Sequence, residues 1–321
     1  MLRDILKGDD QADAVAEVIA RVAPDVLVLN GIDYDHGNLT LTALEALVAQ
    51  RGHRMPFLFA ARPNSGRATG LDLDGDGRLG GPGDSQGWGR YAGDGGMAVL
   101  SRFRIGAARD LSGLLWAGQD WALLPREEGK LVPSEAAYEA QRLSSVGHWV
   151  VPVEIGGRNL SVMAFHATPP VFDGPEDRNG KRNHDEIVLW RHLLDGAYGG
   201  VPDGPFVIAG DANLDPLDGE GIKVAITGLL SDKRLQDPAP RSAGAGAAAD
   251  ADHRGDPALD TVDWPRAEAG GPGNLRVDYV LPSAGLEVMG AGVWWPAPGE
   301  SDQEIATRAS RHRLVWVDIR W

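Results

Sequence analysis

The sequence contains no cysteine among its 321 residues. This absence excludes disulfide bonds, thiolate-bound zinc and cysteine nucleophiles. The sequence also has no apolar run near the roughly 20 residues that a membrane-spanning helix needs. The first residues, MLRDILKGDDQ, lack the long apolar core of a signal peptide. We therefore expect no membrane span, and either a cytoplasmic protein or an exported one whose signal precedes this chain.

Positive charge is scarce. Lysine and arginine total 31 against 46 aspartates and glutamates, which gives a net charge of −15. Proteins that bind nucleic acid through its phosphates usually have a basic face, so nucleic acid is a disfavoured partner. A local basic pocket remains compatible with a small phosphorylated substrate.

Apolar residues make up 43% of the chain, enough for a large core, and no internal repeat is visible. Helical spacing predicts helices over 10–22, 41–50 and 184–194. Strands are predicted at 26–30, 57–60, 97–100, 146–155, 158–165, 206–209, 277–281 and 314–319. These elements predict an α+β fold in one domain, residues 1–321, with two packed, mostly antiparallel β-sheets flanked by helices in a four-layer sandwich. Segments 62–95 and 239–257 are rich in Gly, Asp or Ala and are predicted to be loop insertions.

The strongest local motif is GDAN at 210–213, directly after the apolar run FVIA. Strand alternation places Asp211 and Asn213 on the same side at the carboxyl end of that strand. A carboxylate there can bind a cation or accept a proton from water, and an amide can hold a phosphate oxygen. The alternative is an Asx turn without catalytic meaning.

Five segments, in this order, resemble the endonuclease/exonuclease/phosphatase superfamily, the fold of DNase-like nucleases, sphingomyelinases and inositol phosphatases. They are PDVLVLN (24–30), MAVLSRFRI (97–105), FVIAGDANLDP (206–216), RVDYVLPS (276–283) and ASRHRLVWVDI (309–319). The resemblance implies that His166 contacts the scissile phosphate and that Asp278 orients His312. Segments 71–91, 143–149 and 166–186 resemble a bacterial subgroup more closely.

Two further clusters are candidate binding sites. Arg178, Lys181, Arg182 and His184 stand just before the predicted helix, where basic groups and a helix N-terminus would bind phosphate. The alternative is a solvated loop with Asn183 or Asp185 as the helix cap. Asp72, Asp74 and Asp76 begin an EF-hand-like D-x-D-x-D-G pattern that suits Ca²⁺, with Asp84 as a candidate additional ligand, against the alternative of a merely acidic loop.

The resemblance implies a divalent cation, Mg²⁺ or Mn²⁺, but three expected ligands depart from the family pattern. The first strand with its Asn has no counterpart, Gly31 stands at the Glu position, and Arg311 stands at the Asp of Ser-Asp-His. Three explanations compete. Other groups, namely Asp33, Asp211, Asn213 and His166, hold the metal; Arg311 replaces its charge and clamps phosphate; or the chain is a repurposed binding protein.

The function we expect is hydrolysis of a small or lipid-like phosphate ester by activated water. In this hypothesis Asp211 activates the nucleophile, Asn213 and His166 contact phosphate, and His312 stabilises or protonates. The alternatives are a catalytically altered ligand- or calcium-binding protein and, third, a nuclease.

Overall fold

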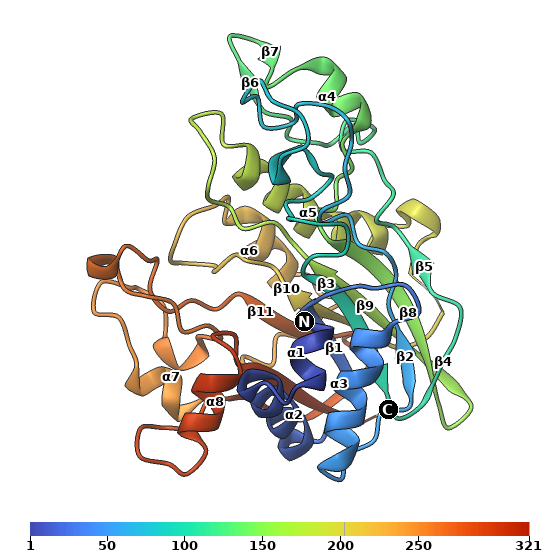
Figure 1. Cartoon of the computed structure of the whole chain (residues 1–321), viewed down its shortest axis with the longest axis vertical. Helices are drawn as coiled ribbons and strands as arrows, with labels where there is room; N and C mark the ends of the chain where they lie inside the picture. Colours follow the sequence, from blue (N-terminus) through green and yellow to red (C-terminus); the bar gives the residue numbers. More distant parts are fainter. Residues whose placement is uncertain (202, 321) are drawn as a thin grey trace.

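The computed structural model describes residues 1–201 and 203–320, and Figure 1 shows their arrangement. The helices are α1 (Leu2–Leu6), α2 (Asp10–Val22), α3 (Leu39–Gln50), α4 (Glu135–Ala140), α5 (Arg178–Leu194), α6 (Val224–Leu230), α7 (Ala243–Ala247) and α8 (Gln303–Ala309). The strands are β1 (Val26–Ile32), β2 (Phe57–Phe59), β3 (Gly96–Ser101), β4 (Arg104–Ile105), β5 (Arg109–Asp110), β6 (Arg126–Glu127), β7 (Lys130–Leu131), β8 (Gly147–Ile155), β9 (Arg158–His166), β10 (Phe206–Asp211), β11 (Asp278–Pro282), β12 (Glu287–Trp294) and β13 (Leu314–Arg320).

The largest sheet has the order β11-β10-β9-β8-β4, with β5 also pairing with β8. Its strands β8 and β9 form the predicted hairpin around Gly156 and Gly157, both of which have positive φ. Strand β10 then pairs parallel to β9 and antiparallel to β11. The carboxyl ends of β9 and β10 therefore meet the amino end of β11 at one edge of this sheet.

The remaining strands form smaller sheets. Strands β1, β3 and β2 make a three-stranded antiparallel sheet in the order β1-β3-β2, whereas β12 and β13 form a two-stranded sheet. A register shift interrupts β1 between Asn30 and Ile32, where Gly31 has a φ of 77°. Strands β6 and β7 form a separate hairpin.

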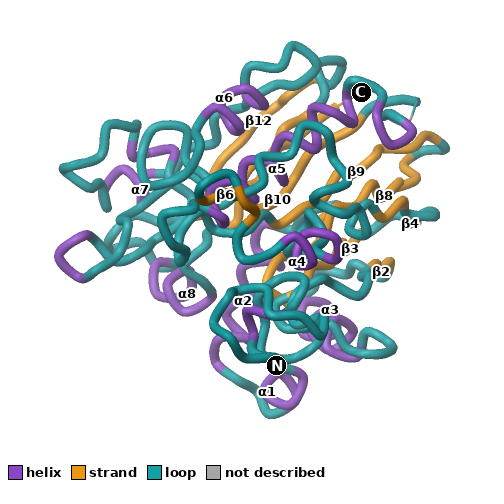
Figure 2. The backbone as a smooth tube through the Cα atoms, turned by 90° about the horizontal axis from the view of Figure 1, so that it is seen from above, coloured by secondary structure: helices purple, strands orange, loops and turns teal. Residues whose placement is uncertain are grey.

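Apolar side chains pack these elements into four layers. Helices α1 to α3 cover one face of the β1-β3-β2 sheet through residues such as Ile19, Leu44 and Leu100. The opposite face packs against the large sheet through Val99 and Val151, and the outer face of the large sheet packs against α5 and α6. Figure 2 shows α2 and α3 on one side of the strands and α5 and α6 on the other. The predicted α+β fold with helices flanking mostly antiparallel sheets is confirmed.

The start of α5 is a correction to the sequence analysis. The basic cluster does not precede the helix but lies within it, because α5 begins at Arg178 with Asp177 as its N-cap. Neither Asn183 nor Asp185 caps the helix; both are fully buried inside it. The apolar periodicity starts late because the first turns of α5 bury polar side chains that find hydrogen-bond partners.

The two predicted loop segments differ in content. Segment 62–95 holds no helix or strand beyond a single 3₁₀ turn at Pro82–Asp84. Segment 239–257 contains the short helix α7, whose N-cap Ser242 accepts a hydrogen bond from the backbone N–H of Ala245. Within residues 1–201 and 203–320, no helix combines the length and the apolar character needed to cross a membrane.

Candidate active site

Three side chains project from neighbouring strand ends of the large sheet. Asp211, the last residue of β10, is the register partner of His166 at the end of β9 and of Asp278 at the start of β11. GDAN therefore places its aspartate between a histidine and a second carboxylate. Gly210 makes this possible, because a Cβ at that position would lie 1.9 Å from the carbonyl oxygen of Phe165.

The carboxylate of Asp211 is buried and held in place from two sides. Its Oδ1 accepts a hydrogen bond of 2.7 Å from the backbone N–H of Asn213, and its Oδ2 lies 3.5 Å from Nε2 of His166. Asn213 adopts a φ of 49°, and its side-chain amide donates to the carbonyl of Ala167. Asn213 thus fixes the turn that orients Asp211.

His312 and Asp278 form the predicted pair. Nδ1 of His312 lies 3.0 Å from Oδ2 and 3.2 Å from Oδ1 of Asp278, and 3.9 Å from Oδ2 of Asp211. The hydroxyl of Thr261 donates to Oδ2 of Asp278 at 2.8 Å, and the ring of Trp264 meets the imidazole edge-on at 5.5 Å. The imidazole is therefore held between two carboxylates.

Burial and neighbouring charges separate the pKa values of these groups. Burial, reinforced by the negative charge of Asp278, raises the pKa of Asp211 to about 7. Burial alone would lower the pKa of His312, but the carboxylates of Asp278 and Asp211 outweigh it and raise this pKa to about 9. Burial and the charge of His312 lower the pKa of His166 to about 4. At neutral pH, His312 is a cation, His166 is neutral, and Asp211 is near its midpoint.

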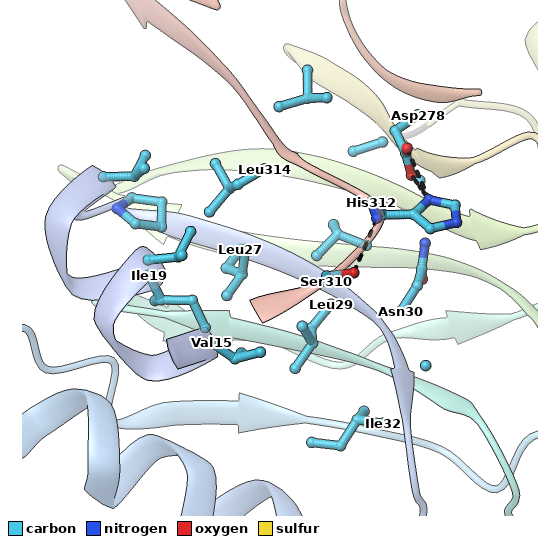
Figure 3. A pocket seen from close by; sticks show the side chains of 18 of the residues that line it. Val15, Ile19, Leu27, Leu29, Asn30, Ile32, Asp278, Ser310, His312 and Leu314 are labelled. Atoms are coloured by element: carbon cyan, nitrogen blue, oxygen red, sulfur yellow. Dashed lines mark hydrogen bonds and ion pairs between the residues drawn. The ribbon is translucent and has the colours of Figure 1, made fainter. Parts of the chain in front are cut away.

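A cavity of about 1540 Å³ opens beside these groups and continues along β1 and β13. Asn30, at the end of the apolar part of β1, lines this cavity, and Figure 3 shows its side chain directed toward His312. Its Oδ1 is buried and, within residues 1–201 and 203–320, has no hydrogen-bond partner. An amide oxygen of this kind is available to a ligand.

The sequence profile of the Endonuclease/Exonuclease/phosphatase family matches residues 2–312. The chain belongs to this family. No curated protein matches the chain in sequence.

Solved structures show the same fold at low sequence identity. An endonuclease/exonuclease/phosphatase from Beutenbergia cavernae is similar over 96% of this chain and 66% of its own, with 19% identity and a TM-score of 0.57. A family protein from Leptotrichia buccalis is 17% identical over 97% of this chain and 93% of its own, with a TM-score of 0.54. Beta toxin from Staphylococcus aureus is 14% identical over 96% and 91%, with a TM-score of 0.51.

The structure separates Asp33 and Arg311 from the central cluster of this family member. Asp33 lines the same cavity, but its carboxylate lies 3.4 Å from the amino group of Met1 and accepts from the backbone N–H of Gly95. Arg311 is exposed and, as far as residues 1–201 and 203–320 define the cavity, does not line it. This placement disfavours a guanidinium clamp beside His312.

The basic residues of α5 also lie away from this cavity, judged on the part of the chain that the structure describes. Arg182 is buried and donates to the backbone carbonyls of Leu143, Gln86 and Arg142. Nδ1 of His184 contacts the carboxylate of Asp185 at 2.8 Å. These contacts favour a packing role for Arg182 and His184, and Arg178 lies on the same helix outside the cavity.

Asp211, Asp278 and His312 could together hold a metal ion, since each offers a ligand atom within 4.8 Å of the others. Mg²⁺ needs only one or two carboxylates and keeps several waters, and Asn30, whose amide Oδ1 has no hydrogen-bond partner among the described residues, lines the same cavity. This donor set fits a divalent cation even though Gly31 supplies no ligand. The raised pKa of His312 opposes metal binding through its imidazole, because a ligating histidine must lose its proton.

A second acidic group lies in the loop over 71–84. Asp72, Asp74 and Asp84 have ligand atoms within 4.8 Å of one another, and Asp76 is not part of this group among the described residues. Several of the oxygens already accept backbone N–H groups: Asp72 from Gly75 and Gly77, and Asp84 from Leu73 and Gly81. Calcium binding here stays a prediction.

Sequence reasoning missed three residues of the site. Asn30 carried the same signal as His166, a polar side chain ending an apolar strand, and could have been found by that rule. Thr261 and Trp264 come from the segment between α7 and β11, and no local pattern marks them. Their importance follows only from contacts across the fold.

Proposed function

We propose that the protein is a phosphoesterase that hydrolyses a small or lipid-like phosphate ester by activated water. One observation carries this proposal: Asp211 lies between His166 and the His312–Asp278 pair, and the pKa values of Asp211 and His312 are about 7 and 9. Pairs of titratable groups whose environments push their pKa values apart are typical of acid–base catalysis.

In this proposal Asp211 is the general base. A carboxylate with a pKa near 7 accepts a proton from water more readily than an ordinary aspartate, and its unprotonated form is still populated at neutral pH. The backbone N–H of Asn213 keeps Oδ1 occupied, which leaves Oδ2 facing His166 and His312. The attacking water therefore binds next to Oδ2.

His312 supplies positive charge and a proton in the same proposal. Asp278 holds Nδ1 of His312, so Nε2 is free to donate to a phosphate oxygen or to the leaving group. His166 remains neutral and contacts phosphate as a hydrogen-bond partner, and Asn213 contacts phosphate from the turn after β10.

A divalent ion, Mg²⁺ or Mn²⁺, completes the proposed site. Asp211, Asp278 and Asn30 would hold it, with Asn213 alongside. When bound, it neutralises phosphate charge and stabilises the attacking and leaving oxygens. Without Glu at Gly31 we expect weak affinity, so that activity depends on added metal in the millimolar range.

A bis-aryl phosphate assay with and without chelator tests the proposal. We expect hydrolysis that needs added Mg²⁺ or Mn²⁺ and is lost in Asp211→Asn, while the matched variant Asp33→Asn, in the same cavity but outside the cluster, retains it. Full activity in chelator would overturn the metal-dependent form. No hydrolysis of any phosphoester with any metal would favour the repurposed binding protein.

Restoring the family's Glu at Gly31 tests the proposed metal site less cleanly than the sequence alone suggests, because the substitution also strains the backbone. A Cβ there meets no atom within 4 Å, but the φ of +77° is one that a side-chain-bearing residue rarely adopts. Gly31→Glu therefore costs roughly 1–2 kcal/mol of strain. Gain of metal-dependent activity in Gly31→Glu with Arg311→Asp would still support the proposed metal site.

A further inference from the structure

Two polar side chains of α5 bind the backbone of the segments that follow β9 and β10. Asn183 and Glu186 are three residues apart, so they project from the same face of the helix, and both are completely buried. Judged on residues 1–201 and 203–320, neither of them lines the cavity. Their hydrogen bonds end instead on the backbone next to His166 and Asp211.

Glu186 continues the pairing of β8 and β9 past the point where their ladder ends. The last pair is Gly147 with His166, and the chain then runs through Thr168 into two prolines, which have no N–H with which to continue a ladder. If the register continued, Ser145 would lie opposite Thr168. The carboxylate of Glu186 replaces the missing bonds. Its Oε1 accepts from the backbone N–H and the hydroxyl of Ser145 at 2.6 and 2.7 Å, and its Oε2 accepts from the backbone N–H of Thr168 at 2.6 Å.

Asn183 joins the segment after β9 to the segment after β10. Its Nδ2 donates to the carbonyl of Thr168 and to the carbonyl of Ala212, both at 2.7 Å. Ala212 stands between Asp211 and Asn213 in the GDAN motif. Both neighbours of the amide are acceptors, so its nitrogen has to face them, because a flipped amide would bring three oxygens together. One side chain therefore sets how far apart the two segments lie.

The backbone held in this way carries two groups of the proposed reaction. His166 is two residues before Thr168, and Asp211 is directly before Ala212. Nε2 of His166 lies 3.5 Å from Oδ2 of Asp211. A misplacement of about 1 Å in a catalytic group can lower the rate roughly 100-fold. A small shift of either segment would therefore change a contact on which the reaction depends.

Stability alone gives little reason for these two residues. Oδ1 of Asn183 is buried and has no hydrogen-bond partner within the described part of the chain, and a buried polar atom without a partner costs free energy. Glu186 places a carboxylate in the interior, where well-packed apolar groups are often no less stable than charged ones. An apolar side chain, however, has no donors or acceptors with which to hold two backbone segments at a set distance.

We propose that Asn183 and Glu186 are positioning residues of the candidate active site. Together they hold the segments after β9 and β10 so that His166 and Asp211 keep the separation that hydrolysis needs. The inference rests on the proposed phosphoesterase activity, and it is therefore tested both with and without hydrolysis.

Steady-state hydrolysis of a bis-aryl phosphate by Asn183→Leu is the first test, because leucine is similar in size and has no donor. The matched control is Asp185→Leu in the same helix. Asp185 is also completely buried, and its removal likewise leaves two N–H groups without their acceptor, those of the Trp116 indole and the Leu123 backbone. We expect similar losses of Tm in the two variants, but a fall in kcat of about 100-fold, with KM changed less than about threefold, only in Asn183→Leu. An equal loss of kcat in both variants, or a loss confined to KM, would overturn the inference.

A milder variant serves if Asn183→Leu does not fold. Asn183→Ala leaves a polar space in which water can bridge the carbonyls of Thr168 and Ala212. We expect its kcat to fall at least about tenfold, the effect of exchanging well-placed donors for a less rigid bridge. A kcat equal to that of the wild type would overturn the role given to Asn183.

Glu186→Gln tests the second residue with little change of shape. Its amide NH₂ has to face the backbone N–H of either Thr168 or Ser145, so one hydrogen bond is lost, and we expect kcat to fall about tenfold. Because Asn183 and Glu186 both hold Thr168, the double variant Asn183→Leu with Glu186→Gln should lose less than the product of the two single losses. Losses that multiply would overturn a shared action at Thr168.

Crystal structures without substrate test the positioning apart from catalysis. In Asn183→Leu the distance between Nε2 of His166 and Oδ2 of Asp211 should change by about 1 Å, and in Asp185→Leu it should stay as it is. An unchanged distance in Asn183→Leu would overturn the inference, whatever the activity of the wild type. A displacement in a protein that hydrolyses no phosphoester would support the positioning and contradict only the proposed function.

Discussion

The two sides of the candidate active site are built differently. On one side, β9, β10 and β11 form an unbroken ladder that delivers His166, Asp211 and Asp278 in register. On the other side, Asn30 and His312 come from the neighbourhood of β1 and β13, and within residues 1–201 and 203–320 each of these strands is paired along one edge only. His166, Asp211 and Asp278 therefore rest on the well-paired sheet, whereas Asn30 and His312 rest on or beside strands that are paired along one edge only.

Substitution of Asp211, the proposed general base on the well-paired sheet, should have the largest effect on activity. Asp211→Asn keeps the shape and the hydrogen bond from Asn213 but cannot accept a proton, so we expect kcat to fall by roughly 10²–10⁴-fold. Steady-state hydrolysis of a bis-aryl phosphate measures this. Asp33→Asn is the control and should lose far less; an equal loss in both variants would contradict the role given to Asp211.

Hydrogen exchange of the backbone amides compares the two sides directly. Amides of β1 and β13 should exchange at least about 100-fold faster than those of β9 and β10, because local opening needs less free energy where a strand is paired on one edge only. Mass spectrometry of peptic fragments measures the difference. Uniform protection across the four strands would show that the second edges of β1 and β13 are covered in solution.

Acid should destabilise the paired side through His148. This residue of β8 is fully buried; its Nε2 donates to the carbonyl of Glu186, its Nδ1 accepts from Ser144, and burial lowers its pKa to about 4. The unfolded chain, with a pKa near 6.5, binds more protons between pH 4 and 6.5, so stability falls as pH drops through this window. The full effect is about 3 kcal/mol.

Urea unfolding at pH 6.5 and pH 4 tests this expectation in the wild type and in His148→Gln. The loss of stability on acidification should be smaller in the variant by up to about 3 kcal/mol. The same loss in both proteins would assign the acid sensitivity to other groups, such as His166, whose pKa burial also lowers to about 4.

The pH dependence of activity should depend on one group from each side of the candidate site, Asp211 and His312. Activity should fall about tenfold per pH unit below about 7 as Asp211 is protonated, and again above about 9 as His312 loses its proton. Asp278→Asn removes the charge that raises the pKa of His312, so the alkaline limb should move to lower pH. An unchanged alkaline limb would exclude His312 as the group that titrates there.

The smallest expected effect is a gain in stability when Ca²⁺ binds the loop over 71–84. If Ca²⁺ binds Asp72, Asp74 and Asp84, then 1 mM Ca²⁺ should stabilise the protein by about 1 kcal/mol, which raises Tm by roughly 2 °C. Asp74→Asn should remove this shift and Asp76→Asn should not, although both side chains accept a neighbouring backbone N–H. If 1 mM Ca²⁺ does not raise the Tm of the wild type, the loop is acidic but does not bind calcium.

Local sequence predicted the elements whose apolar pattern is continuous. The runs VLVLN and FVIA became β1 and β10, and the apolar spacing over 10–22 became α2. It failed for the start of α5, where Arg182, Asn183 and Asp185 are buried through polar contacts rather than apolar ones. Short strands such as β4 and β5 were also missed, because two residues carry no measurable period.

The sequence by itself determined the fold class and placed Asp211 and Asn213 at a strand end, because apolar runs and turn residues are local properties. The roles predicted for His166, Asp278 and His312 came from the resemblance to the family. The tertiary structure decided what surrounds them. It separated Arg311 and the basic residues of α5 from the cavity and brought Asn30 to it. It also placed Thr261 against Asp278 and Trp264 against His312. These features depend on which distant segments meet, and strand pairing across the chain has no local signature.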